Sequence, residues 1–267
     1  MTKRQESPVF SPQTIRIYRS WSWVRSDFSE EFDRLSKDGA FLPDGISETI
    51  WSTRSKFVLK VPTSLGFDAA YKSFRRIRNF HQYLLRPSAC AAEAVNYMRL
   101  AELGFPLPDL LAVGETRCGF LLKNAFMVSR FADGFRNGLD FARKGIHLGN
   151  MPLLTEFCRG HLGLLAKLHD KGIVHRGFTP GNLLYRQKPG TGGMDLLWID
   201  VASCRRSAIS TRDIATDMFH LFRYLNISPD VRRELQACYL DAASVKRTNA
   251  DELFDAVEKR IENRMKI

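Results

Sequence analysis

The chain has 267 residues, a formal net charge of +11, and 44% hydrophobic and 11% aromatic residues. This apolar share supports a buried core and argues against a disordered chain, and the length admits one large domain or two small ones. The positive charge indicates an anionic partner, such as nucleic acid, a phosphorylated glycan or an acidic membrane face.

The cysteines and the first residues indicate the compartment. The five cysteines are scattered, and no pair has the spacing of metal ligands, so we expect free thiols in a reducing compartment. The opening segment MTKRQESPVF lacks the apolar core of a signal peptide. No run of about 18 apolar residues is present. We therefore expect a cytoplasmic protein that is at most peripherally attached to a membrane surface.

The first half of the chain is predicted to be rich in strands. A polar arm over 1–15 precedes a small lobe over 16–132. Its predicted elements are, in chain order, a hairpin over 41–61 with a turn at Pro43-Asp44-Gly45, a basic and aromatic stretch over 66–86, a helix between Pro87 and Gly104, and strands over 109–115 and 119–131. The hairpin ends in the short apolar strand 57–61, which carries Lys60.

The second half is predicted to be mainly helical. The break at Ala132-Asp133-Gly134 suggests a boundary, so that 133–267 forms the second lobe. Its predicted elements are an amphipathic helix over 151–171, a short strand and hairpin reaching Asp200, and helices near 211–225, 229–243 and 249–265. Strands with one helix, followed mostly by helices, indicate an α+β, two-lobed arrangement.

The segment 168–204 carries the clearest catalytic pattern. Protein-kinase active sites have the order His-Arg-Asp, four residues, Asn, and then a strand that ends in Asp. His175, Arg176, Asn182 and Asp200 stand at these spacings. Gly177 occupies the position of the catalytic Asp. The pattern therefore predicts a two-lobed protein-kinase-like fold, with a small β-rich N-lobe, a helical C-lobe and a degenerate catalytic loop.

Phosphoryl transfer explains why these residue types occur together. ATP phosphates need a lysine, the lysine needs a carboxylate, and Mg²⁺ is held by an Asn and an Asp. Lys60 and Glu93 are the candidates for binding ATP, and Asn182 and Asp200 are the candidates for binding Mg²⁺. Each residue alone has an ordinary structural explanation. Their joint order is what predicts the site.

Other residues of the loop are predicted to support it. His169 and His175 fit buried imidazoles that bind loop carbonyls. Arg176 could bind an anion or a carboxylate, and Asp213 and Asp217 in the next helix are the nearest candidates. We expect these two carboxylates to anchor the loop rather than to take part in catalysis.

With these residues in place, the chain resembles the lipopolysaccharide-core kinase family (Kdo/WaaP type), a branch of the protein-kinase-like fold. The resemblance covers about residues 50–225. It is carried by RPSACAAEAVNYMRLAELGFPLPDLLAVGETRCG, whose Ser-x-x-x-x-Glu helix, Pro-x-Pro linker and Gly-Glu-x-Arg strand are similar to that family's hallmark, and by LAKLHDKGIVHR, GNLLY, LWIDVAS and TRDIATDMFHLFRYL.

The resemblance implies an activity and its partners. It implies ATP and Mg²⁺, and an acceptor hydroxyl on Kdo or heptose of the lipopolysaccharide inner core, at the cytoplasmic membrane face. The charge of +11 and the basic, aromatic stretch 66–86 fit an anionic glycolipid. No recognition motif for nucleic acid accompanies the charge, so no nucleic-acid partner is expected.

Three departures from the pattern leave alternatives open. Gly177 replaces the general base, the metal motif reads Asp200-Val201-Ala202 instead of Asp-Phe-Gly, and no glycine-rich loop accompanies Gly45. A general base contributes about 10²–10⁴-fold, so a slow kinase is one reading. A pseudokinase that binds nucleotide or glycolipid and regulates or scaffolds a partner is the second. A phosphotransferase of the antibiotic-modifying type is a weaker third, because its loop also keeps the Asp.

Overall fold

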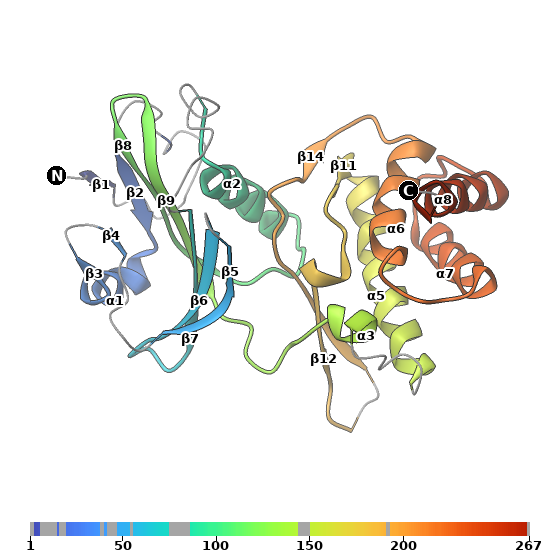
Figure 1. Cartoon of the computed structure of the whole chain (residues 1–267), viewed down its shortest axis with the longest axis horizontal. Coiled ribbons are helices and arrows are strands. Elements are labelled where there is room, and N and C mark those ends of the chain that lie inside the picture. Colours follow the sequence, from blue (N-terminus) through green and yellow to red (C-terminus); the bar gives the residue numbers. More distant parts are fainter. Residues whose placement is uncertain are drawn as a thin grey trace. The chain divides into compact units, whose positions relative to one another are not determined.

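The computed structural model describes residues 3–5, 15, 20–37, 40–41, 47–53, 56–74, 86–143, 150–190 and 193–265. The chain divides into two compact units, Met1–Asp133 and Gly134–Ile267, called unit 1 and unit 2 below. Unit 1 is built on a β-sheet, and unit 2 is mostly helical (Figure 1). The predicted α+β class is therefore confirmed.

Unit 1 contains one large sheet. In the described part of the chain its strand order is β1-β2-β8-β9-β7-β6-β5. The strands are β1 (Lys3–Gln5), β2 (Trp21–Val24), β5 (Glu48–Ser52), β6 (Lys56–Pro62), β7 (Asp68–Phe74), β8 (Leu110–Cys118) and β9 (Leu121–Arg130). The β1–β2 pair is parallel and the other pairs are antiparallel. Residues 3–5 of the predicted polar arm thus form a sheet edge.

Smaller elements cover part of this sheet. The helix α1 (Ser29–Arg34) is followed by a two-stranded sheet, β3 (Ser36–Lys37) with β4 (Ala40–Phe41). Phe28 and Phe32 are buried in a core cluster with residues of β6, β7, β8 and β9. Phe32 stacks on Phe126 of β9, with ring centroids 5.9 Å apart. Aromatic packing of this kind fixes α1 against the sheet.

The helix α2 (Ala89–Glu102) packs against β8 and β9. It begins at Ser88, whose hydroxyl accepts a hydrogen bond from the backbone N–H of Ala91 at 3.1 Å. It ends before Gly104, which has a φ of +78°. Cys90, Ala94 and other small or apolar residues bury one face of the helix. The same packed helix carries Glu93.

Two predicted segments of this half lie partly outside the described residues. The hairpin predicted over 41–61 is formed by β5 and β6, which are joined at 53–55, and the turn predicted at 43–45 lies outside the described residues. The stretch 66–86 contains the strand β7, and its residues 75–85 also lie outside the described part. The predicted helix at 87–104 and the two strands after it are confirmed as α2, β8 and β9.

In its described part, unit 2 contains the four predicted helices, α5 to α8, and a short helix, α3, that was not predicted. They are α3 (Leu139–Arg143), α5 (Met151–Asp170), α6 (Thr211–Phe222), α7 (Pro229–Ala242) and α8 (Ala250–Met265). The helix α5 packs against α7, and α6 packs against α8. Side chains at the preceding residue cap three of them: Asn150 for α5, Ser210 for α6 and Ser228 for α7. Local sequence therefore fixes where these helices begin.

Short strands in unit 2 flank the segment predicted to be catalytic. The strand β11 (Ile173–Val174) pairs with β14 (Arg205–Arg206), and β12 (Leu183–Gln187) pairs with β13 (Met194–Trp198) and β10 (Arg136–Asn137). Residues 175–182 run between β11 and β12. Tyr185 of β12 stacks on Phe141, with ring centroids 5.0 Å apart. It also meets the Phe157 ring edge-on, with centroids 5.5 Å apart. This aromatic core supports the hairpin at one end of the loop.

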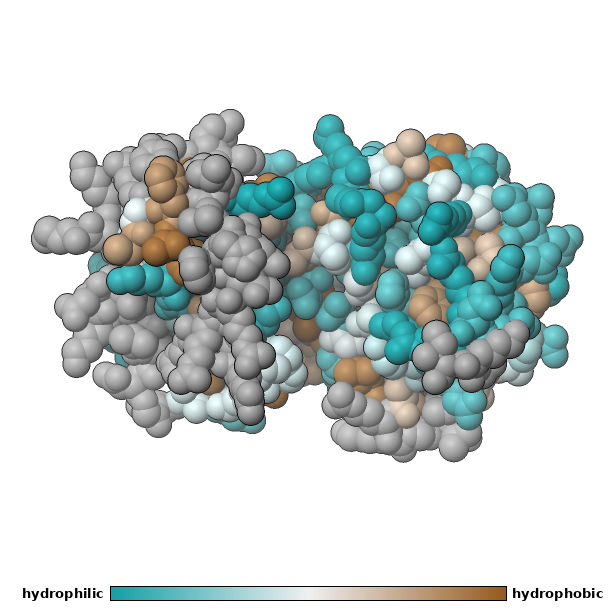
Figure 2. Space-filling view, turned by 45° about the horizontal axis from the view of Figure 1, so that its top comes forward, coloured by the Kyte–Doolittle hydropathy of each residue, from teal (hydrophilic) through white to brown (hydrophobic). Residues whose placement is uncertain are grey.

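The surface is mixed in character. On the face drawn in Figure 2, hydrophilic side chains cover most of unit 2, and apolar residues occur in small groups between them. Within the described ranges, no helix is both long and apolar enough to cross a membrane.

Candidate active site

In unit 1, a lysine and a buried glutamate form an ion pair. Lys72 Nζ on β7 lies 2.6 Å from Glu93 Oε2 on α2. The Glu93 side chain is 2% exposed, and that of Lys72 is 20% exposed. Alternation along β7 buries Tyr71 and Ser73 on one face and directs Lys72 to the other. The pairing thus follows from strand geometry together with the packing of α2 on the sheet.

Lys60 does not form the predicted pair with Glu93. Its Nζ lies 2.9 Å from Asp68 Oδ2 and 2.9 Å from Asp133 Oδ1, and 4.6 Å from the centre of the Phe131 ring. The hydrogen bond to Asp133, followed by that to Asp68, raises the pKa of Lys60. The partner predicted for Lys60 is therefore wrong: Lys72, which lies in the stretch 66–86 that was predicted to be basic and aromatic, contacts Glu93 instead.

The register of the sheet explains the difference. Lys60 is paired with Ala70, and Val58 is paired with Lys72. Both lysines thus lie on the same face of the sheet, on adjacent strands. The sequence signal that could have found Lys72 is its place in the segment DAAYKSF, the last described strand before α2, between Tyr71 and Phe74.

A buried polar cluster holds the start of α2. Glu115 Oε2 accepts hydrogen bonds from Arg117 Nε at 2.7 Å and Trp21 Nε1 at 3.2 Å, and Glu115 Oε1 accepts one from the backbone N–H of Ser88 at 2.6 Å. Arg117 also donates to the carbonyls of Arg86 and Phe120 at 2.8 and 3.1 Å. The Glu115 and Arg117 side chains are fully buried. The Gly-Glu-x-Arg segment seen in the sequence is therefore a clamp on the N-terminus of the helix that bears Glu93.

In unit 2, Asp217 of α6 anchors the loop that begins at His175. Its carboxylate accepts hydrogen bonds from the backbone N–H groups of His175 at 2.9 Å and Arg176 at 2.6 Å. His169 Nε2 lies 3.1 Å from the same carboxylate, and His169 Nδ1 lies 2.7 Å from Tyr239 Oη. Burial alone would raise the pKa of Asp217, but the hydrogen bond and charge of His169 outweigh it and lower that pKa.

These contacts test the predictions for the supporting residues. The expectation that Asp217 anchors the loop is confirmed, although it binds the backbone of Arg176 rather than the guanidinium. Asp213 instead completes a capping box with Ser210 at the start of α6. Arg176 is exposed and has a φ of +58°, which turns the chain sharply after His175.

His175 is an internal support of the loop. Its ring is fully buried and meets Phe178 and Trp198 edge-on, with centroids 5.5 and 5.2 Å away. Its Nδ1 accepts a hydrogen bond from the backbone N–H of Gly177 at 3.3 Å. Burial lowers the pKa of His175 to about 4, so the imidazole is neutral at pH 7. A buried, neutral ring fits a structural role, not direct contact with a substrate.

Gly177 and Asn182 are joined directly. The Asn182 side-chain amide donates to the Gly177 carbonyl at 2.8 Å, and the backbone N–H of Thr179 donates to the same oxygen at 2.7 Å. The backbone N–H of Ile199 donates to the Asn182 carbonyl at 2.9 Å. Asn182 precedes β12, and Asp200 follows β13. Both residues therefore lie at the same end of the β12–β13 hairpin.

The donor set of this hairpin end suits magnesium. Asp200 is exposed and has a φ of +54°, a conformation that non-glycine residues rarely adopt and that is common at functional positions. Over the described ranges, no cluster of three or more His, Cys, Asp or Glu side chains could hold a metal ion. Mg²⁺ is usually held by one or two carboxylates together with substrate phosphates, and one Asp with one Asn fits that pattern.

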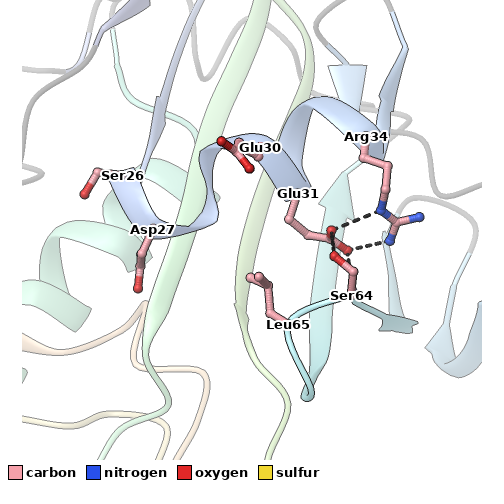
Figure 3. Close-up of a pocket in the computed structure, with 7 residues that line it drawn as sticks. All are labelled: Ser26, Asp27, Glu30, Glu31, Arg34, Ser64 and Leu65. Carbon is pink, nitrogen blue, oxygen red and sulfur yellow. Dashed lines mark hydrogen bonds and ion pairs between the residues drawn. The ribbon is translucent and has the colours of Figure 1, made fainter.

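A separate pocket of about 460 Å³ lies in unit 1 beside α1. Figure 3 shows Glu31 directed toward Arg34 and Ser64 in this pocket. The hydrogen bond from Arg34 is the largest cause that lowers the pKa of Glu31 to about 2, and Ser64 donates to it through its backbone N–H at 2.9 Å. None of the predicted site residues lines this pocket, and the buried Glu31 carboxylate in it is already bound within the protein.

Comparison with known proteins agrees with this arrangement. The model of the lipopolysaccharide kinase (Kdo/WaaP) family matches residues 72–240, a range that begins at Lys72 and covers more than half of the chain. No curated protein sequence matches significantly. A solved structure, "WaaP in complex with acyl carrier protein", has a TM-score of 0.59 and 16% identity, over 90% of this chain and 92% of that chain. At this identity the likeness concerns the fold. From the match of the family model, the chain belongs to the lipopolysaccharide kinase (Kdo/WaaP) family.

Proposed function

We propose that this protein transfers the γ-phosphoryl group of ATP to a sugar hydroxyl of the lipopolysaccharide inner core. The Lys72–Glu93 pair is the observation that carries the proposal. Burying a carboxylate and pairing it with a lysine adds little net stability, because desolvation offsets most of the attraction. Such a pair is therefore better explained by a need to hold a positive charge in place.

Within this proposal each residue has a defined task. Lys72, held by Glu93, would bind phosphate oxygens of ATP, and Asn182 and Asp200 would hold Mg²⁺. Mg²⁺, when bound, neutralises the charge that develops on the transferred phosphoryl group. Asp217 and His175 keep the backbone of the loop in position. Arg176 is exposed and could bind an anionic group of the acceptor.

The acceptor and the place of reaction follow from charge and family. An inner-core sugar bears anionic groups, and a net charge of +11 favours its approach. The acceptor is embedded in a membrane, so we propose peripheral contact with the cytoplasmic face of the inner membrane. Kdo and heptose hydroxyls are the candidate acceptors.

A second candidate is supported by Gly177. Two carboxylates near the loop in sequence or space are already bound: Asp217 is buried beneath it, and Asp170 accepts hydrogen bonds from the backbone of Ser244 and Val245. Neither is placed to serve as a general base. A pseudokinase that binds nucleotide or glycolipid without transfer is therefore the alternative.

The test is transfer of labelled phosphate from ATP, with Mg²⁺, to lipopolysaccharide core that contains Kdo and heptose. The native protein is compared with Asp200→Ala and with Asp195→Ala, a control on the same hairpin that pairs with Arg186 and Lys188. We expect slow transfer that Asp200→Ala abolishes and Asp195→Ala preserves. Undiminished transfer by Asp200→Ala contradicts the proposal. A silent native protein that is stabilised by ATP supports the pseudokinase.

A further inference from the structure

The hydroxyl of Ser203 lies directly beside the position that the first side-chain atom of residue 177 would occupy. A Cβ atom added to Gly177 would lie 2.8 Å from Ser203 Oγ, which is closer than such atoms normally approach. The next two atoms, Asn182 Nδ2 and His175 Nδ1, would lie at 3.6 and 3.7 Å, which are ordinary contacts. Of these three nearest atoms, only the Ser203 hydroxyl must move to admit a side chain.

Ser203 also makes a bond that the loop uses. Its hydroxyl donates to the carbonyl oxygen of His175 at 2.8 Å, and Asn182 donates to the carbonyl of Gly177 at 2.8 Å. The side chains of Ser203 and Asn182 thus hold two of the three carbonyl groups of residues 175–177, although neither belongs to that segment. Ser203 follows Asp200 by three residues, so its bond ties the segment after Asp200 to the start of the loop.

The backbone of Gly177 does not require a glycine. The glycines with positive φ in the described chain are at other positions, whereas Arg176 takes the left-handed conformation next to it. Position 177 could therefore carry any side chain without backbone strain. The constraint at this position comes from its neighbour, Ser203.

We propose that Ser203 is a positioning residue that replaces the missing Asp in holding the 175–182 loop, and that its bonded hydroxyl and a side chain at position 177 exclude each other. The consequence for catalysis rests on the proposed function. An Asp placed at 177 collides with the Ser203 hydroxyl, so its carboxylate is pushed away from the position that a base needs. Restoring an effective base then requires a second change, Ser203→Ala, which removes only the hydroxyl.

The first test is a cycle of melting temperatures with Gly177→Ala, Ser203→Ala and the double variant. With Ser203 present, we expect Gly177→Ala to lower the melting temperature by roughly 2–4 °C, because a hydrogen bond is lost. In the Ser203→Ala background, the same change should be neutral or stabilising, since alanine restricts the unfolded chain more than glycine does. Ser207→Ala, a nearby serine change, is the control and should be additive with Gly177→Ala. Additivity in the Ser203 cycle overturns the proposal.

The second test is phosphate transfer from ATP to lipopolysaccharide core as a function of pH. We expect Gly177→Asp/Ser203→Ala to exceed Gly177→Asp by about tenfold or more, out of the roughly 10²–10⁴-fold that a base can contribute. The double variant should also gain an acidic limb in its pH profile, which a merely structural repair does not produce. Equal rates for the two variants overturn the exclusion. If no variant transfers phosphate, the proposed function fails, and the melting cycle alone decides the role of Ser203.

Discussion

Lys72 Nζ and Glu93 Oε2 lie 2.6 Å apart, and this contact joins the strand β7 to the helix α2. The carboxylate is 2% exposed, so the pair is shielded from solvent on the glutamate side. Glu93 is fixed because α2 is fixed, through the hydrogen bond from the Ser88 backbone to Glu115 at 2.6 Å. The position of the Lys72–Glu93 pair therefore depends on a buried cluster at the N-terminus of α2, where Ser88 lies five residues before Glu93.

The two lysines of unit 1 should differ in function. We expect Lys72→Met to lower phosphate transfer at least about 10²-fold, because it removes a charge that stabilises the transferred phosphoryl group. Lys60→Met removes a partly exposed lysine bound by Asp68 and Asp133 and should change transfer far less. Transfer rates at saturating ATP, measured for both variants, decide the assignment. Equal losses in the two variants would contradict it.

The buried Glu115–Arg117 pair should be important for the stability of unit 1. Arg117→Met leaves the Glu115 carboxylate buried without its partner, which costs about 3–5 kcal/mol. Urea denaturation followed by tryptophan fluorescence measures this loss, since Trp21 donates to the same carboxylate. Arg233→Met, at an exposed pair with Asp251, is the control and should have little effect. Adding Glu115→Gln to Arg117→Met should recover part of the loss, and a purely additive double variant would argue against a buried charge.

Asp217→Asn should loosen the loop without removing any group that contacts a substrate. An asparagine keeps one acceptor oxygen but places an NH₂ group against one of the backbone N–H groups of His175 and Arg176. We expect faster hydrogen exchange at these two amides and a fall in transfer. Hydrogen–deuterium exchange, followed by mass spectrometry of a peptide spanning 173–182, measures the protection of these two amides. Unchanged protection with reduced transfer would instead indicate a direct catalytic role for Asp217.

Stability should fall as the pH drops from about 6.5 toward 4. Burial lowers the pKa of His175 to about 4 and that of His161 to about 3, against an ordinary value near 6.5. In this window the unfolded chain binds protons that the folded chain does not, so the free energy of unfolding rises with pH and is fully recovered above about 6.5. The loss is on the order of 3 kcal/mol for His175 at pH 4.

A variant at His161 separates the loss of stability that the buried histidines cause between pH 6.5 and 4 from any loss caused by protonation of carboxylates. His161 Nδ1 accepts a hydrogen bond from Trp198 Nε1 at 3.0 Å, and the Oδ1 of an asparagine can accept the same bond. We expect His161→Asn to be less stable at pH 7 but to show a smaller loss between pH 6.5 and 4. Denaturation midpoints over this range measure the slope, and a slope that matches the native protein would rule out His161 as a contributor.

Local signals in the sequence predict much of this protein. The capping residues Ser88, Ser210 and Ser228 and the glycine at 104 bound their helices through contacts within a few residues, so periodicity and caps locate α2, α6 and α7. The spacing of His175, Asn182 and Asp200 predicts the loop and hairpin because it matches the order of residues in a protein-kinase active site. The same local order identifies the family.

The tertiary structure decided which lysine meets Glu93 and what surrounds Gly177. Lys60 and Lys72 both stand in apolar strands before α2, and only the β6–β7 register and the packing of α2 separate them. The contact of Ser203 with the space at Gly177 joins positions 26 residues apart through the hairpin that lies between them. Sequence patterns record spacing along the chain, whereas these pairings depend on distances between elements, which appear only when the strands and helices have packed.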